Sequence, residues 1–152
     1  MNSSALLDYY RAHACSTQWR GFLLALCEEF DSALPDAELA RLMARIGERF
    51  GRDHALPAVA TLDELQHAAN AVWSSTEWGQ VVFEEAPEQV RIHHAASPLS
   101  AVLGTRAGWE TGFLEGVYRQ WFRAAGMMSV LDVRYLQSDH PDVATYTLSR
   151  VF

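Results

Sequence analysis

The amino-acid sequence predicts an α+β fold, in which N-terminal helices precede a small antiparallel sheet of about four strands and a long helix separates the two strand pairs. Apolar residues recur at spacings of three and four through the first half of the chain, which indicates amphipathic helices. Runs of β-branched residues and alternating patterns dominate the second half. The length of 152 residues is typical of one domain, so residues 1–152 are expected to fold as a single unit.

Two helical patterns open the chain. Ala5–Ala14 is predicted to form a short helix, and Ser16 or Thr17 then caps a second one. The apolar residues of the second helix recur at helical spacing and are expected to face a core: Trp19, Phe22, Leu23, Leu26, Cys27 and Phe30. Cys15 and Cys27 are interpreted as reduced packing residues, because buried free cysteines behave as small apolar side chains.

Two more helices are predicted before Trp78. One begins at Pro35-Asp36 and ends near Gly51, with a repeat of apolar residues at helical spacing: Leu39, Leu42, Met43, Ile46 and Phe50. The other begins at Thr61, and Glu64 stands three residues later. This Thr-x-x-Glu pattern is typical of a helix start, because the two side chains can cap each other's backbone amides.

The strands are predicted in two pairs. Val81–Phe83 and Val90–His93 are expected to form a hairpin, and Val130–Leu136 and Thr145–Val151 are expected to close the chain as the second pair. Between the pairs, Trp109–Ala125 is predicted to be a helix. Its apolar residues spread over about half of the helix circumference, which is wider than the stripe that one core needs. This helix is therefore expected to bury two faces.

Glycines at intervals of four give this helix a smooth strip, formed by Gly108, Gly112 and Gly116. Each glycine weakens a helix by about 1 kcal/mol, so the strip indicates close approach of another backbone. That backbone belongs either to the sheet or to a copy of the same helix, and we take the following residues as candidates for a subunit interface: Gly112, Phe113, Gly116, Val117 and Trp121.

The sequence contains none of the glycine-rich phosphate-binding loops and no nucleophile elbow. Glu64 and His67 form one Glu-x-x-His, but a di-iron site requires a second copy. His93 and His94 are neighbours on a predicted strand, where successive side chains point to opposite faces. One is expected to pack inward and the other to meet solvent. No catalytic residue, metal site or cofactor is predicted.

Charge and hydropathy restrict the partners. Twelve Lys and Arg against nineteen Asp and Glu give a net charge of −7, which disfavours binding to nucleic acid. No apolar run approaches the roughly 20 residues of a membrane span, and the start of the chain lacks the pattern of a secretory signal. A cytoplasmic protein without direct membrane insertion is therefore expected.

Several short segments, taken in order, resemble the D-subunit family of bacterial cellulose synthase. They are Trp78-Gly79 before a strand, Arg91-Ile92-His93-His94 on the next strand, and Phe113-Leu114-Glu115-Gly116-Val117-Tyr118 followed by Trp121. Upstream, Phe22-Leu23-x-x-Leu26, Arg49-Phe50 and Thr61-Leu62-x-Glu64-Leu65 fit the same order. The resemblance covers nearly the whole chain from Trp19 onward.

The resemblance implies a non-enzymatic accessory subunit of the cellulose synthesis machinery. It implies assembly of paired dimers into a homo-octamer around passages for nascent β-1,4-glucan, with effects on export, bundling and crystallisation of this exopolysaccharide of biofilms. Other proteins of the synthase complex, including a proline-rich scaffold protein, are the implied partners. Because the N-termini of that family line the passages, these residues are assigned to glucan or partner contact: Asn2, Ser3, Ser4, Leu6, Tyr9 and Tyr10.

Two other functions remain open. The chain is alternatively a small ligand-sensing module for heme or another hydrophobic molecule, because a glycine-containing helix followed by two strands also occurs in such domains. His93 or His94 would then bind the heme. A hydrolase acting on glucan is the other possibility, with Glu110 and Glu115 as its carboxyl groups.

Overall fold

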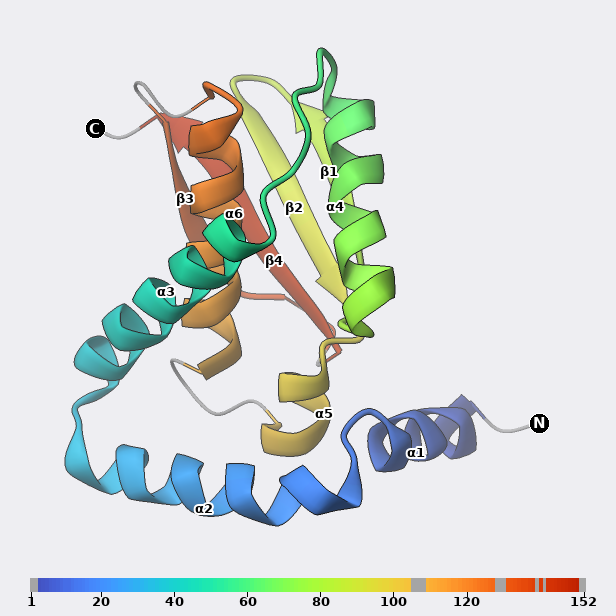
Figure 1. Ribbon diagram of the computed structural model, residues 1–152, viewed down its shortest axis with the longest axis vertical. Helices are drawn as coiled ribbons and strands as arrows, with labels where there is room; N and C mark the ends of the chain where they lie inside the picture. Colours follow the sequence, from blue (N-terminus) through green and yellow to red (C-terminus); the bar gives the residue numbers. More distant parts are fainter. Residues whose placement is uncertain (1–2, 105–108, 128–130, 139, 141, 151–152) are drawn as a thin grey trace.

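The computed structural model describes residues 3–104, 109–127, 131–138, 140 and 142–150 (Figure 1). Within these residues the helices are α1 Ser3–His13, α2 Thr17–Ala33, α3 Asp36–Asp53, α4 Leu62–Thr76, α5 Pro98–Leu103 and α6 Trp109–Ala124. The strands are β1 Gln80–Ala86, β2 Gln89–Ala95, β3 Leu131–Leu136 and β4 Val143–Arg150. They form one antiparallel sheet in the order β1-β2-β4-β3. The predicted fold class is confirmed.

Helix α6 lies between α3 and the sheet, as Figure 1 shows, and so buries two faces as predicted. Towards the sheet, Tyr118 meets Phe83 of β1 and Tyr146 of β4. Towards α3, its glycines allow the two backbones to approach closely. A side chain at Gly116 would place its Cβ against the carbonyl group of Ala44, and one at Gly112 would collide with Ala40.

This packing corrects the assignment of α6 to a subunit interface. The backbone that the glycines admit is that of α3 in the same chain, which is neither the sheet nor a second copy. A glycine on α3 allows the same close approach from the other side, because Gly47 lies against the backbone of Phe113. All five candidate residues are buried within the chain: Gly112, Phe113, Gly116, Val117 and Trp121. Gly108 lies outside the described residues.

Helix α4 and the hairpin follow the sequence prediction closely. Thr61 Oγ1 accepts a hydrogen bond from the amide of Glu64 at 3.1 Å, as the Thr-x-x-Glu pattern predicts. The Glu64 carboxylate accepts from the amide of Ala60 at 2.9 Å, one residue before the expected partner. The cap sets the start of α4, which then runs along the outer edge of β1.

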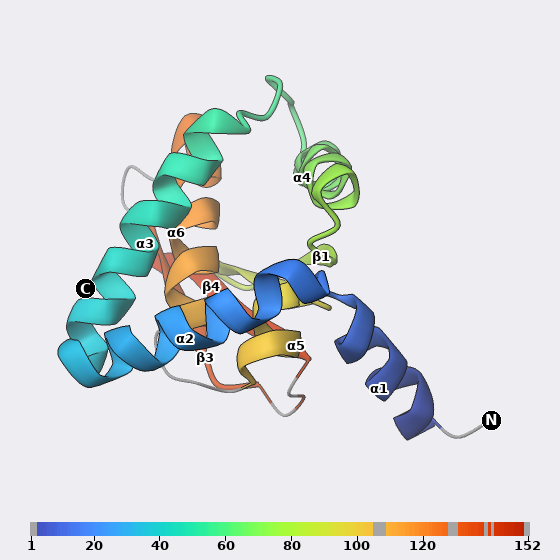
Figure 2. The ribbon, with the colours of Figure 1, turned by 60° about the horizontal axis from the view of Figure 1, so that its bottom comes forward.

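Helix α2 departs from the prediction. Its second half packs inward, where Cys27 is buried and Phe30 stacks on Trp109 at a centroid distance of 5.9 Å. Its first half does not, because α1 and α2 wrap around α5 at one end of the molecule (Figure 2). Trp19 and Phe22 are therefore exposed, and the expectation that they face a core is wrong.

The short helix α5 was not expected from the sequence. Ser97 caps it by accepting from the amide of Leu99 at 3.2 Å, and Pro98 occupies its first turn. Ser-Pro is a typical helix start, but a helix of six residues, Pro98 included, is too short to give a periodic signal. In the second strand pair, β4 begins at Val143, two residues before the predicted start, and Val130 and Val151 lie outside the described residues.

Candidate contact surface on the N-terminal arm

Apolar side chains that the fold leaves exposed gather at the N-terminal end of the chain. We call residues 3–22, which comprise α1 and the first part of α2, the N-terminal arm. Helix α1 has no buried residue. The arm exposes its large apolar residues to an unusual degree: Leu6 56%, Leu7 40%, Tyr9 66%, Trp19 54% and Phe22 57%. Large exposed apolar surface on a folded chain is typical of a contact surface.

The aromatic rings of the arm occur in two pairs. Tyr9 stacks on His13 at a centroid distance of 4.1 Å, and Trp19 meets Phe22 edge-on at 6.0 Å. The His13 ring also bonds through Nδ1 to the carbonyl oxygen of Tyr9 at 2.8 Å, which holds the first pair in place. Each pair presents a rigid, partly apolar surface that a sugar ring or an apolar protein surface can cover.

Polar contacts hold the arm against the rest of the molecule. The Tyr10 hydroxyl donates to the carbonyl oxygen of Ser97 at 2.9 Å. Arg11 pairs with Asp142 at 3.2 Å. The Arg20 guanidinium joins the two helices of the arm, because it donates to the carbonyl oxygen of Arg11 at 2.7 Å. The arm is therefore positioned by these hydrogen bonds and by the Arg11–Asp142 ion pair, and its apolar side chains remain outside.

Tyr10 is an anchor and does not belong to the exposed surface. Burial, with the neighbouring charges of Asp142 and Glu110, raises the pKa of Tyr10 to about 12, so its hydroxyl stays protonated and donates. Ser3, Ser4, Leu6 and Tyr9 lie on the exposed arm, and Asn2 lies outside the described residues. The assignment to glucan or partner contact stays a prediction for these residues. Sequence reasoning missed Trp19 and Phe22, because their helical spacing is also typical of core residues.

A chain of buried hydrogen bonds links β2, α4 and α6. His94 Nδ1 accepts from the Tyr118 hydroxyl at 2.5 Å, and its Nε2 donates to the carbonyl oxygen of Trp78 at 2.7 Å. The Tyr118 oxygen in turn accepts from Trp73 Nε1 at 3.1 Å. Burial lowers the pKa of His94 to about 4 and raises the pKa of Tyr118 well above its usual value, so both stay neutral.

These contacts bear on the heme alternative. Both ring nitrogens of His94 are engaged by protein groups, so neither is directed at an iron. His93 points to the other face of the sheet, as expected, and its ring nitrogens meet Thr145 at 3.3 Å and Glu84 at 3.1 Å. Neither histidine offers the free nitrogen that an axial ligand requires.

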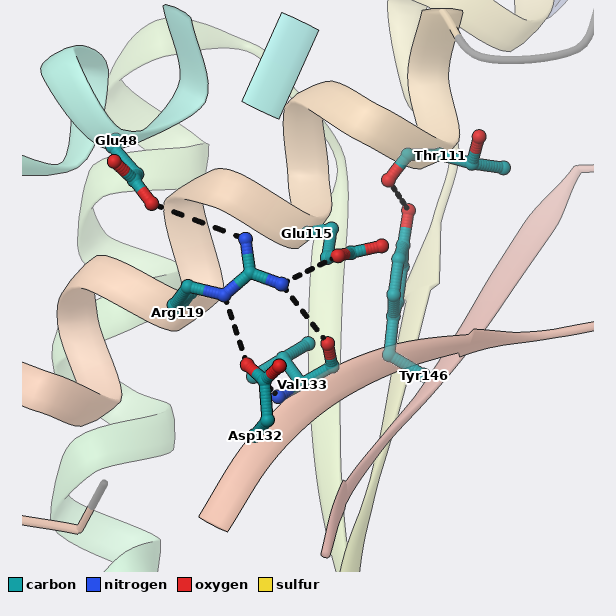
Figure 3. A network of polar contacts seen from close by, with 7 residues as sticks. All are labelled: Glu48, Thr111, Glu115, Arg119, Asp132, Val133 and Tyr146. Carbon is teal, nitrogen blue, oxygen red and sulfur yellow. Dashed lines mark hydrogen bonds and ion pairs between the residues drawn. The ribbon is translucent and has the colours of Figure 1, made fainter. Parts of the chain in front are cut away.

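Glu110 and Glu115, the two carboxyl groups of the hydrolase alternative, lie in different surroundings. Burial raises the pKa of Glu110 to about 7, with an opposing hydrogen bond from Ser100. Glu115 binds Arg119 at 2.5 Å, and Arg119 also binds Asp132 at 2.9 Å and approaches Glu48 at 3.9 Å (Figure 3). Glu115 is thus part of an ion-pair network that joins α6 to α3 and β3, an arrangement that favours a structural role.

The part of the chain that the structure describes contains no group of three or more His, Cys, Asp or Glu side chains placed to hold a metal ion. None of its helices combines the length and the hydropathy that crossing a membrane requires.

Fold and surface together define a small α+β protein whose most distinctive feature is an exposed aromatic arm. The sequence profile of the D subunit of cellulose synthase matches residues 5–147, and the chain belongs to that family.

Solved structures show the same fold in a distant protein. The chain is similar to trafficking protein particle complex subunit 3 from Naegleria fowleri, whose crystal structure is described as covalently bound to palmitic acid. The TM-score is 0.55 with 10% sequence identity, over 95% of this chain and 96% of that one. At this identity the likeness concerns the fold alone. No curated protein has a significantly similar sequence.

Proposed function

We propose that this protein is a non-catalytic accessory subunit of the bacterial cellulose synthase complex. It assembles with copies of itself, as dimers that form an octamer, and it organises the export, bundling and crystallisation of nascent β-1,4-glucan. Membership of the D-subunit family over residues 5–147 supports this role. The cytoplasmic side of the inner membrane is the proposed location, and the other proteins of the complex, including a proline-rich scaffold protein, are the proposed partners.

The exposed arm is the observation that supports glucan contact. Tyr9 and Trp19 are more than half exposed, although most aromatic rings in the described part of the body are buried or half-buried. The faces of such rings stack on the apolar faces of sugar rings. The net charge of −7 does not oppose this contact, because glucan is uncharged. Ser3 and Ser4 add hydroxyl groups of the kind that bond to sugar hydroxyls.

The arm hypothesis is tested with Tyr9→Ala and Trp19→Ala, singly and together. Binding of cello-oligosaccharides to the purified protein is followed by calorimetry, and the fibres made by cells that carry each variant are examined by X-ray diffraction. We expect each substitution to weaken binding by about tenfold, which is about 1.4 kcal/mol, because a sugar ring that covers an aromatic face removes apolar surface from water. Tyr135→Ala is the matched control, since Tyr135 is also exposed but lies on β3.

Unchanged binding and normal fibres in the double variant would contradict glucan contact through the arm.

A second test separates assembly from the effect on glucan. Deletion of residues 1–10 is expected to leave the mass of the assembly unchanged, measured by light scattering coupled to gel filtration, while the cellulose of the cell loses order. A wild-type protein that remains a monomer at all concentrations would contradict the proposed assembly.

A groove beside α4 supports a second candidate, the binding of a hydrophobic molecule. It has a volume of about 740 Å³ and is lined mainly by apolar residues of α4 and of the segment before it, among them Leu56, Pro57, Val59 and Val72. Ala71→Trp is expected to fill it. If a fluorescent fatty acid binds the wild type and not this variant, the second candidate gains support. If it binds neither, the candidate fails.

A further inference from the structure

One face of the sheet carries no helix within the described residues. Helix α6 covers the other face, and α4 lies along the edge of β1 (Figure 1). The uncovered face exposes apolar side chains at both of its edges, with Val82 of β1 52% exposed and Leu136 of β3 39% exposed. It also exposes charged side chains, including Glu84 on β1 and Arg134 on β3. We call this surface the open sheet face.

The register places these side chains in two rows across the sheet. Directly opposed residues of neighbouring strands point to the same face. The first row therefore runs Val82, His93, Thr145, Leu136, and the second runs Glu84, Arg91, Thr147, Arg134. Each row begins on β1 and ends on β3. Both ends of the first row are apolar. In the second row the β1 end, Glu84, is acidic and the β3 end, Arg134, is basic.

The edges of the sheet are occupied by side chains, so addition of a strand is disfavoured there. Along β1, Asn70 accepts from the amide of Val81 at 2.8 Å and donates to its carbonyl oxygen at 2.9 Å, and Gln66 accepts from the amide of Phe83 at 2.8 Å. On β3, Arg119 donates to the carbonyl oxygen of Val133 at 3.3 Å (Figure 3). A partner is therefore expected on the face and not at an edge.

We propose that the open sheet face docks on the open sheet face of a second copy, about a two-fold axis parallel to the strands. This rotation keeps each row at the same height and reverses the strand order, so β1 of one copy faces β3 of the other. Glu84 then faces Arg134 of the second copy, and Val82 faces Leu136. Each pair occurs twice, because a two-fold interface is self-complementary.

The charges favour this axis over the alternative. A two-fold axis across the strands at the height of the second row sets Glu84 against Glu84 and Arg134 against Arg134 of the second copy. The same axis between the two rows sets Glu84 against Val82 and Arg134 against Leu136, which leaves both charges without an opposite charge. Like charges in apposition cost several kcal/mol at protein interfaces, and opposite charges fix the register.

The dimensions of the sheet allow this contact. Two packed sheets lie roughly 10 Å apart, a spacing that these side chains span. The face covers roughly 400 Å², less than the usual 800 Å² per partner, so this contact acts together with others in the assembly.

This inference rests on the self-assembly in the proposed function, and it names the surface. The test uses two charge reversals in the full-length protein, Glu84→Arg and Arg134→Glu. Each alone turns both charge pairs of the two-fold contact into like charges. We expect each to raise the dissociation constant of self-association by at least about 100-fold, because every substitution acts twice. The measurement is sedimentation velocity over a range of concentrations, with circular dichroism to verify folding.

Mixing the two variants gives the decisive result. In a mixed pair, Arg at position 84 of one copy faces Glu at position 134 of the other, and the second contact is the native Glu84 with Arg134. Equimolar mixture should therefore restore association to within about threefold of the wild type, and the double variant that carries both reversals should also associate. Control reversals at exposed sites away from the sheet, Arg41→Glu and Glu28→Arg, should leave association unchanged.

The outcomes distinguish the two ideas. A wild-type protein that associates while both reversals associate equally well overturns the open sheet face and leaves the proposed assembly standing. Variants that dissociate but are not rescued by mixing also overturn the two-fold arrangement. A wild-type protein that stays monomeric overturns the assembly itself. The proposal is supported if each single variant self-associates weakly and the equimolar mixture of the two associates as the wild type does.

Discussion

The N-terminal arm and the body of the molecule use the same aromatic residue types in opposite ways. In the body, Trp73 and Tyr118 are fully buried and Trp121 is 3% exposed, whereas Tyr9 and Trp19 on the arm are more than half exposed. The buried rings contact several others and make hydrogen bonds across α3, α4 and α6. The arm is held mainly by polar groups at Tyr10 and Arg11. The body therefore carries the stability of the fold, and the arm exposes the apolar surface for which we propose contact with glucan or a partner.

The α3–α6 contact is the place where the body should be most sensitive. Gly116→Leu introduces a side chain where the backbone of Ala44 already lies, so we expect the free energy of unfolding to fall by at least about 3 kcal/mol. Urea unfolding followed by circular dichroism measures it. Gly21→Ala on the arm is the control, because no atom apart from its chain neighbours and the backbone of its own helix lies within 4 Å of its Cβ position. It should instead stabilise α2 by up to about 1 kcal/mol.

A tolerated Gly116→Leu would mean that α3 and α6 are not in close contact, and the comparison between body and arm would then lose its basis. The same substitution would have tested a subunit interface if the glycines had faced a second copy. Here it reports on folding within one chain.

Two buried groups in the body give stability an unusual dependence on pH. The pKa of His94 is lowered to about 4 by burial, so between pH 6.5 and 4 only the unfolded chain gains a proton at this residue. Acidification through this range lowers the free energy of unfolding by up to about 3 kcal/mol. Burial raises the pKa of Glu110 to about 7, so its protonation between pH 7 and 4.5 favours the folded chain and opposes the loss.

Glu110→Gln removes the opposing effect. We expect the variant to lose stability on acidification from pH 6.5 to 4 more steeply than the wild type, as measured by urea unfolding at fixed pH values. His93→Gln, beside His94 on β2 but on the opposite face of the sheet, is the control and should keep the wild-type slope. Equal slopes for Glu110→Gln and the wild type would show that the two groups do not oppose each other.

The buried hydrogen-bond chain gives a smaller but specific effect. Tyr118→Phe removes the hydroxyl that bonds to both His94 and Trp73, which leaves two buried polar atoms without this partner. The expected loss is about 2 kcal/mol. A matched substitution on the arm, Tyr9→Phe, should cost less than about 0.5 kcal/mol, because Tyr9 is exposed. A loss as large for Tyr9→Phe as for Tyr118→Phe would contradict the division between the two regions.

The smallest effect on stability is expected on the arm. Trp19→Ala should change the free energy of unfolding by less than about 0.5 kcal/mol, although it removes the largest side chain type in proteins. Thermal unfolding by calorimetry measures this change. Trp73→Ala, at a fully buried position, should cost about 3–5 kcal/mol. A strongly destabilised Trp19→Ala would show that this ring packs in the isolated chain after all.

The local signals in the sequence predicted local structure well. The Thr61 cap, the β1–β2 hairpin and the opposite directions of His93 and His94 all follow from short-range rules, and the structure confirms each. Helix α5 was missed because six residues show no period. Of the candidate contact residues, Tyr10 is an anchor, and Trp19 and Phe22, which were expected in the core, are exposed.

The sequence by itself determined the described elements other than α5, their order and the two-faced character of α6, because spacing and capping act between near neighbours in the chain. Only the tertiary structure decided which surfaces those faces meet. The glycine strip of α6 lies on α3, and the apolar stripe of α2 is buried in its second half alone. A period of 3.6 residues states that a helix has an apolar face, but burial depends on which distant segments arrive to cover it.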